Sequence, residues 1–189
     1  MAVSEVSICS NALRKLGDEP ITSLADDSDR ARLCNALYEI NRDATLRAYP
    51  WNFAVKRSSL AQLSSTPAFE YSYEYQLPAN PFCLRVVEVY ESDDDWKVEG
   101  RKILTNQASC SIVYIAKITD TAQFDALFVE ALTSRLASEL AWPIIRSATA
   151  RQSFYQEFQL KLQEARGIDA QEGSTDILIN DELTTRVRW

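Results

Sequence analysis

Residues 46–54 separate two kinds of sequence pattern and constrain the fold more than any other segment. Pro50 lies at the end of a long helical pattern, and the residue before a proline is disfavoured in the α conformation, so a helix must end there. Trp51 and Phe53 follow, two positions apart. Apolar residues recur at helical spacing before this segment and at strand spacing after it, until about Thr121. The segment therefore predicts a junction between a helical part and a β-rich part.

Two helices are predicted before the junction. Ser4 is a suitable N-cap for the first helix, and Gly17 suits the residue just after its end. Asp29 and the acidic residues before it supply caps for the second helix, which is predicted to extend to Ala48. The apolar spacing predicts the buried faces: Ile8, Ala12, Leu13 and Leu16 in the first helix, and Leu33, Leu37, Ile40 (or Tyr38 beside it), Ala44 and Ala48 in the second.

Two further helices are predicted after the β-rich part. The third begins near Thr121 and keeps an apolar stripe over residues 124–140, until Pro143 breaks it. The fourth is predicted over about residues 147–166, because Gly167 and Gly173 mark its end. Its predicted buried side consists of Phe154, Phe158, Leu162 and Ala165.

Five short strands are predicted between the two helical parts. Residues 69–77 alternate strictly between aromatic and polar side chains, which is the period of a half-buried strand. Glu99 and Gly100 favour a tight hairpin. The other predicted strands are 83–90, 96–98, 101–104 and 111–117. Short strands at close spacing indicate an antiparallel sheet or a small sandwich.

These elements predict an α+β fold, mainly a bundle of four helices with an inserted antiparallel β-rich region and an extended C-terminal tail. The helical bundle is assigned residues 1–53 and 119–173, the β-rich insertion residues 54–118, and the tail residues 174–189. The tail is too short to build its own core, so we expect it to dock on something else. Its candidate docking residues are Ile177, Ile179, Leu183, Val187 and Trp189.

The residue types available exclude several kinds of chemistry. The chain has no histidine, which excludes Ser–His and Cys–His nucleophile pairs and histidine-ligated metal sites. Its four glycines form no phosphate-binding motif. Cys9, Cys34, Cys83 and Cys110 lie far apart without a CxxC pair, so we expect buried, apolar cysteines in place of a zinc site. No catalytic, cofactor-binding or metal-binding residue is assigned.

Acidic side chains leave one enzymatic alternative open. The run Asp93-Asp94-Asp95 lacks the glycine and distal glutamate of a calcium loop, so a solvated turn is predicted. Glu70 and Glu74 lie on the polar face of the predicted aromatic strand, where exposure is expected. None of these nominates a carboxylate pair for glycoside hydrolysis, although two acids distant in sequence could meet in the fold.

An aromatic stripe consists of Tyr71, Tyr73 and Tyr75, with Phe69 before them. A platform on which nucleobases stack is usually interleaved with Lys or Arg, whereas the interleaved residues here are glutamate and serine. We therefore expect the stripe to pack in the core or against another subunit.

The net charge of −7 bears on nucleic-acid binding. DNA-binding surfaces cluster Lys and Arg, so this balance argues against a protein that grips DNA. It leaves open a channel wall along which DNA slides without specific binding. No apolar run approaches the ~20 residues of a membrane-spanning helix, and the N-terminal residues lack a secretory pattern, so we expect folding in a cytoplasm.

Several motifs stand in order along the chain: Ile8-Cys9-Ser10-Asn11-Ala12-Leu13, Leu16-Gly17, Ile21-Thr22-Ser23-Leu24, Ala31-Arg32-Leu33-Cys34, Arg42-Asp43, Tyr49-Pro50-Trp51-Asn52-Phe53, Val98-Glu99-Gly100-Arg101, Tyr114-Ile115-Ala116-Lys117 and Phe128-Val129-Glu130-Ala131-Leu132. In this order they resemble the tail tubular protein A family, the head-to-tail adaptors of short-tailed bacteriophages. The proline–tryptophan–asparagine–phenylalanine motif after a helix is the most specific part, and the likeness extends to Gly173.

The resemblance implies a helical bundle with a β-rich insertion, assembled as a homo-oligomeric ring, usually of twelve copies, beneath the portal protein. Such a ring extends the channel for double-stranded DNA, without specific binding, and gives the tail nozzle protein a platform. The C-terminal tail then reaches the portal through its docking residues. Tyr71, Tyr73 and Tyr75 become candidate contacts with a neighbouring subunit or the nozzle. The protein is expected in the virion neck, assembled in the host cytoplasm and away from membranes.

Other hypotheses remain beside this one. Some members of the family are credited with polysaccharide-degrading activity, so a tail-associated polysaccharide or peptidoglycan hydrolase is the second hypothesis, although no catalytic motif is present to carry over. A small DNA-binding module is the third, weakened by the negative charge. At the junction, Tyr49, Pro50, Trp51 and Phe53 are predicted to be structural, with a direct partner contact of Trp51 and Phe53 as the alternative.

Overall fold

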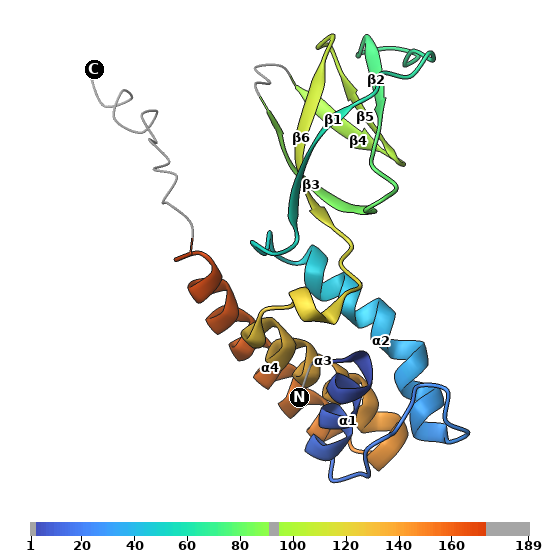
Figure 1. Ribbon diagram of the computed structural model, residues 1–189, viewed down its shortest axis with the longest axis vertical. Coiled ribbons are helices and arrows are strands. Elements are labelled where there is room, and N and C mark those ends of the chain that lie inside the picture. The colour runs from blue at the N-terminus through green and yellow to red at the C-terminus, as the bar shows by residue number, and fades with distance from the viewer. Residues whose placement is uncertain (1–2, 91–94, 173–189) are drawn as a thin grey trace.

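The computed structural model describes residues 3–90 and 95–172. Over these residues the fold is α+β, with four α-helices and two three-stranded antiparallel sheets. Figure 1 shows an elongated molecule with the helices at one end and the strands at the other. The chain leaves the helices after α2 and returns to them after β6.

The first two helices begin at serine caps. α1 spans Glu5–Lys15, and the Ser4 hydroxyl accepts a hydrogen bond at 3.1 Å from the backbone N–H three residues on. Gly17 follows the end of α1 with a φ of +76°, which glycine adopts without strain. α2 spans Asp29–Arg47 and is capped by Ser28. The predicted first helix is confirmed, and the second ends one residue earlier than predicted.

The buried face of α2 is only partly the predicted one: Tyr38, the alternative to Ile40, is buried, and Leu33 and Leu37 are partly buried against the core. Ile40 was expected in the core but is 68% exposed, and Ala48, just beyond the helix, is exposed too. The helix instead buries Ala31, Cys34, Tyr38, Asn41, Arg42, Thr45 and Leu46. Hydropathy places polar residues outside, but these polar side chains have partners within the fold and are therefore tolerated inside.

Arg42 shows how a charge is accommodated on this face. Its guanidinium lies 2.8 Å from the Asp43 carboxylate and 3.1 Å from that of Glu39. Lys117, which follows strand β6 (Cys110–Ala116), pairs with the same two carboxylates. A buried charge is costly unless it is paired, so this network favours one placement of α2 against β6.

The other two α-helices follow the strands. A 3₁₀ turn at Thr121–Gln123 precedes α3 (Ala126–Ile145), and α4 spans Ala148–Asp169. α3 is the central helix, because α1, α2 and α4 all pack against it. Figure 1 shows α2 and α4 on opposite flanks of α3.

Both α3 and α4 extend beyond the predicted stops. Pro143 lies inside the last turn of α3, which ends at Arg146, a residue with a left-handed φ of 54°. Gly167 lies inside α4, which continues to Asp169. A single proline or glycine costs a helix only locally, and the packing of α3 along α4 offsets that cost.

The strands form two sheets, ordered β1-β6-β3 and β2-β5-β4. Besides β6 they are β1 (Val55–Leu60), β2 (Tyr73–Gln76), β3 (Cys83–Tyr90), β4 (Trp96–Glu99) and β5 (Lys102–Thr105). After β1 the chain crosses to the second sheet, where Gln62 bridges to Tyr75 and the Leu63 N–H donates to the Glu74 carbonyl at 2.8 Å. The two sheets are thereby joined along one edge.

Two of the strand predictions are wrong. β1 has no predicted counterpart because its sequence is polar and does not alternate; pairing with β6, from Val55 opposite Ile115 to Leu60 opposite Cys110, makes it a strand. The predicted strand 69–77 is reduced to β2, because Glu70 has a φ of 74° and turns the backbone before it. The other four predicted strands match β3 to β6 within one residue at each end.

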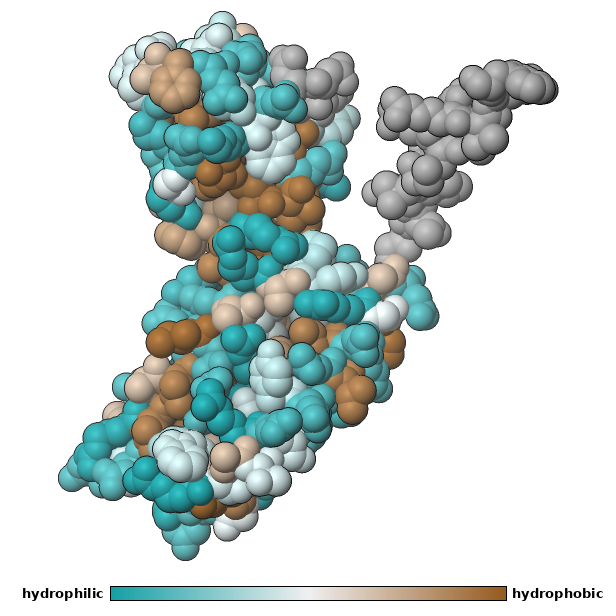
Figure 2. All heavy atoms as spheres, turned by 180° about the vertical axis from the view of Figure 1, so that it is seen from behind, coloured by the Kyte–Doolittle hydropathy of each residue, from teal (hydrophilic) through white to brown (hydrophobic). Residues whose placement is uncertain are grey.

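One continuous apolar core runs through both parts of the molecule. It includes Leu13 of α1, Trp51 of the junction, Ile115 of β6 and Phe128 of α3. Seen from behind, hydrophobic side chains gather at the waist between strands and helices (Figure 2). The waist is therefore part of the core.

The four cysteines are all free and buried, as predicted. Burial raises the pKa of the Cys83 and Cys110 thiols, which lowers their thiolate fraction near neutral pH. We expect no fast reaction of any native cysteine with a disulfide reagent such as Ellman's reagent, and reaction of all four in guanidinium. A Ser64→Cys variant, at an exposed position, supplies the positive control. A native thiol that reacts as fast as the added one would contradict the burial.

Candidate functional site

The junction after α2 is built around Trp51. This side chain is 0% exposed, and its Nε1–H donates to the Thr45 carbonyl at 3.1 Å. Its ring meets Phe128 of α3 edge-on at 5.2 Å and Tyr49 at 5.1 Å, measured between centroids. Because the one polar atom of the indole has an acceptor inside α2, the whole side chain can be buried.

Phe53 extends the same aromatic cluster toward the strands. Its ring lies 5.1 Å from that of Phe128 and 5.8 Å from that of Phe124. The backbone N–H groups of Ala54 and Val55 both donate to the Trp51 carbonyl, at 2.8 and 2.9 Å, so the chain makes a tight turn into β1. The cluster thus joins the end of α2, the start of α3 and the first strand.

Asn52, between these aromatics, holds the end of α4. Its backbone N–H donates to the Asp169 carboxylate at 3.1 Å, and its side-chain amide donates to the Asp169 carbonyl at 2.6 Å. Arg166 adds a bond from Nη2 to the Ala48 carbonyl at 3.1 Å. Burial raises the pKa of the Asp169 carboxyl, although the Asn52 N–H opposes that shift. Sequence reasoning did not identify Asn52 or Asp169, because they lie too far apart along the chain.

We predict that Trp51→Ala destabilises the protein by about 3–5 kcal/mol, because it leaves a cavity and removes three ring contacts. Urea unfolding measures this loss. Trp142→Ala is the matched control, since that indole is 50% exposed and its loss should change stability far less. An unchanged stability of Trp51→Ala together with failed assembly would favour a direct partner contact instead.

The three tyrosines predicted to contact a neighbour occupy different environments. Tyr75 is 1% exposed, and its hydroxyl donates to the Gln107 carbonyl at 2.8 Å. It packs inside its own chain, so it is not a surface for another subunit. Tyr71 and Tyr73 are half-buried, and only these two remain contact candidates.

Glu74 is buried, contrary to the expectation of an exposed polar face on this strand. Its carboxylate accepts from Lys102 Nζ at 2.6 Å and from the Ser65 hydroxyl at 2.7 Å. The Lys102 bond, followed by the Ser65 bond, holds the pKa of Glu74 below its usual range. Lys102, which lies opposite Gln76 on β5 and reaches Glu74 diagonally, compensates the charge, and the alternation of the sequence does not reveal this contact.

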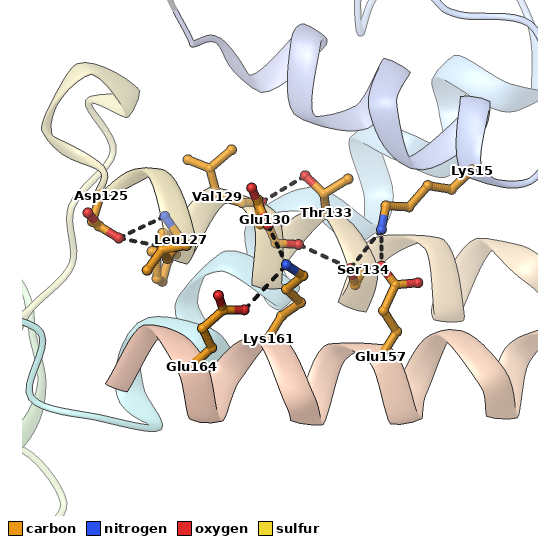
Figure 3. Close-up of polar contacts among 11 residues, drawn as sticks. Lys15, Asp125, Leu127, Val129, Glu130, Thr133, Ser134, Glu157, Lys161 and Glu164 are labelled. Atoms are coloured by element: carbon orange, nitrogen blue, oxygen red, sulfur yellow. Dashed lines mark hydrogen bonds and ion pairs between the residues drawn. The ribbon is translucent and has the colours of Figure 1, made fainter. Parts of the chain in front are cut away.

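A polar cluster joins α1, α3 and α4 (Figure 3). Lys15 of α1 ion-pairs with Glu157 of α4, and its Nζ donates to the Ser134 hydroxyl of α3 at 3.0 Å. Figure 3 also shows Lys161 between Glu130 and Glu164, at 2.8 and 3.3 Å. These contacts tie three helices together on one side of the helical part.

Ser134 and Lys15 have the residue types of a catalytic pair in which a lysine activates a serine nucleophile. Ser134 is 0% exposed, so a substrate has no access to its hydroxyl. Lys15 also forms an ion pair with Glu157, so its Nζ is engaged in a structural contact between α1 and α4. The arrangement fits a structural cluster.

The pKa of Glu157 makes this cluster pH-sensitive. Burial raises it, but Lys15, Ser134 and Lys161 together outweigh burial and leave it below the usual 4.5. A lowered folded-state pKa stabilises the fold above the unfolded value, and this contribution is lost as the pH falls through the folded value.

We therefore predict that Glu157→Gln lowers the stability at pH 7 by roughly 1 kcal/mol or less, because both partners are about one-third exposed and solvent screens the pair. The difference from the unmodified protein should shrink as the pH falls below 4.5, the usual value for glutamate. Urea unfolding at several pH values measures it. Glu164→Gln, which loses an exposed i,i+3 pair, is the control. A difference that is constant with pH would contradict the charge-based origin.

Large hydrophobic side chains are exposed at both ends of the molecule. The β end carries Phe69, Tyr90 and Val98, of which Phe69 is 80% exposed. The far helical end, where α3 turns into α4, carries Trp142 and Ile145. Beside them lies a groove of about 600 Å³ whose apolar lining is Leu16, Leu33, Pro143, Ile144 and Ile145. Exposed apolar clusters of this kind are typical of protein contacts.

Some predicted residues lie outside the described part of the chain. They are the tail candidates Ile177, Ile179, Leu183, Val187 and Trp189, together with Asp93 and Asp94 of the acidic run. Within residues 3–90 and 95–172, no group of three or more Cys, Asp or Glu side chains is placed to hold a metal ion. None of the helices described there combines the length and apolarity needed to cross a membrane.

Comparison with known proteins gives no assignment: no protein-family model matches the chain, and no curated protein matches it either.

Proposed function

We propose that the protein is a head-to-tail adaptor of a short-tailed bacteriophage, a member of the tail tubular protein A family. It is a structural component of the virion neck and has no catalytic role. Copies of the chain form a ring, of twelve subunits in the family pattern, between the portal protein and the tail nozzle protein. The ring lines the channel through which double-stranded DNA is retained after packaging and later ejected.

The observation that carries this proposal is that an elongated molecule exposes apolar side chains at both of its ends, in addition to those along the flanks of its helices. Phe69, Tyr90 and Val98 stand at the β end, and Trp142 and Ile145 at the far helical end. A bridge between two protein assemblies requires a contact surface at each end. The core continues through the waist and holds the helical part and the β part in a fixed relative position. A rigid body of this kind suits a connector.

In this proposal the four helices act as one bundle around α3, with residues 1–53 and 119–173, and residues 54–118 form the β-rich insertion. Residues 174–189 form the portal-docking tail. In the sequence it comes shortly after α4, whose last turn is held by Asn52 and Ala48. An anchored tail favours docking, because the tether raises the effective concentration of the tail near its binding site.

The charge of the chain agrees with this role. A net charge of −7 disfavours a tight grip on phosphates, so DNA can slide along the channel without specific binding. Assembly takes place in the host cytoplasm, and no membrane is involved.

The experiment that tests the proposal mixes the purified protein with the portal protein of the same genome and images the product by electron microscopy. We expect a ring on the portal with the chain as its subunit. Absence of any complex, together with absence of the protein from virions, would refute the proposal. An assay on envelope polysaccharide and peptidoglycan should show no turnover, whereas turnover would favour the tail-associated hydrolase.

We predict that a chain ending at Gly173 folds normally but no longer attaches to the portal. Circular dichroism and thermal melting measure the fold, and co-sedimentation with the portal measures attachment. A full-length variant with serine at Ile177, Ile179, Leu183, Val187 and Trp189 should fail in the same way, because apolar contacts are removed. Replacement of Thr184 and Thr185 by serine is the control. Unchanged attachment of the shortened chain would contradict the role of the tail.

A further inference from the structure

α2 carries a row of apolar side chains that its own chain covers only in part, since Leu33 and Leu37 also pack against the core. The row consists of Leu33, Ala36, Leu37, Ile40 and Ala44. Ile40 is 68% exposed, Ala36 is exposed and the other three are half-buried. Figure 2 shows hydrophobic side chains at intervals down this flank. Leu33, Leu37, Ile40 and Ala44 follow one another at intervals of four, three and four residues, which is the spacing of a helix–helix seam.

α4 presents a second face without a partner in the chain. On the side away from α3 its residues are exposed and all uncharged: Thr149, Gln152, Ser153, Gln156, Gln159, Leu160, Gln163 and Gly167. The glutamines at 152, 156, 159 and 163 have the same four, three and four spacing as the row on α2. A quarter of the chain is charged, so an uncharged face along a surface helix of 22 residues is unusual.

A hollow on α4 offers space for a side chain that projects from the row on α2. A shallow hollow of about 590 Å³ lies on α4, lined by Gln156, Gln159, Leu160, Leu162, Gln163 and Arg166. Ile40 is the side chain that projects furthest into solvent from the row on α2. The helices have 19 and 22 residues, which correspond to lengths of about 28 and 33 Å at 1.5 Å per residue.

Charge explains why the two faces suit one another. Copies with a net charge of −7 repel each other, so a stable contact between them must avoid burying like charges. The row on α2 and the exposed glutamine face of α4 meet this requirement, because neither contains an acidic side chain; Arg166 is the one charged residue that lines the hollow on α4. The glutamine amides can donate and accept hydrogen bonds at the rim while Leu160 packs against the aliphatic row.

We propose that α2 of one copy packs its apolar row on the uncharged face of α4 of the next copy. The two faces lie on opposite flanks of α3, so the contact is heterologous and propagates from copy to copy. When the rotation between successive copies closes, such a contact produces a ring. The inference deepens the proposed function and rests on it for the ring, but the contact itself can be tested without a portal.

The test uses two charge insertions at matched positions, Ile40→Glu on α2 and Leu160→Glu on α4, both at side chains that are 68% exposed. Sedimentation velocity over a concentration series compares each variant with the unmodified protein. Each variant alone should lose the species larger than a monomer. Their equimolar mixture should form a one-to-one dimer and nothing larger, because the α4 face of the Ile40→Glu copy and the α2 row of the Leu160→Glu copy are both intact.

Val87→Glu, at a 39% exposed position on β3, is the control and should assemble like the unmodified protein. Thermal melting checks that all variants are folded.

The proposal is overturned if both variants assemble normally, if the mixture forms no dimer, or if the unmodified protein never self-associates, alone or on the portal. If both variants form normal rings on the portal, the proposed contact between α2 and α4 is refuted, whereas the proposed adaptor function is still supported. No ring from the unmodified protein would refute the adaptor proposal, whereas the mixed dimer would still support the contact.

Discussion

The burial of Trp51 is the constraint on which both parts of the molecule depend. Its indole fills the space where α2 ends, α3 begins and β1 departs, and the Thr45 carbonyl satisfies its N–H. The next residue, Asn52, anchors the end of α4 through Asp169. One short segment therefore positions three helices and a strand, and it can do so because Pro50 ends α2 just before it.

Paired charges determine which faces of the helices meet. Arg42 is buried with Asp43 and Glu39 beside it, and Lys15 joins α1 to Glu157 of α4. The buried guanidinium of Arg42 is costly to leave unpaired, whereas the partly exposed pair of Lys15 and Glu157 contributes less to the choice of packing. The same pairs explain the surface of α2: a satisfied polar side turns inward, and the apolar row containing Ile40 turns toward solvent.

The unpartnered surfaces of the molecule are distributed in a way that agrees with the proposed adaptor. Exposed apolar side chains at the two ends suit axial contacts with the portal and the nozzle. The faces on α2 and α4 lie on the two flanks, where neighbours in a ring would stand. Ring subunits need both kinds of contact, and large apolar or uncharged areas are typical of obligate assemblies.

The sequence by itself determined the kinds of elements and most of their bounds. The caps Ser4 and Ser28, the stop at Pro50, the strands β3 to β6 and the burial of all four cysteines follow from local conformational preference and hydrophobic spacing. Only the tertiary structure decided the features that depend on partners distant in the chain. Pairing with β6 makes β1 a strand, Lys102 permits the burial of Glu74, and the bond from Arg135 of α3 to Asn41 keeps the polar side of α2 inward, with Ile40 on the outer side. The hydropathy pattern predicts how apolar a face is. It does not predict whether a polar side chain forms a hydrogen bond or an ion pair with a residue distant in the chain.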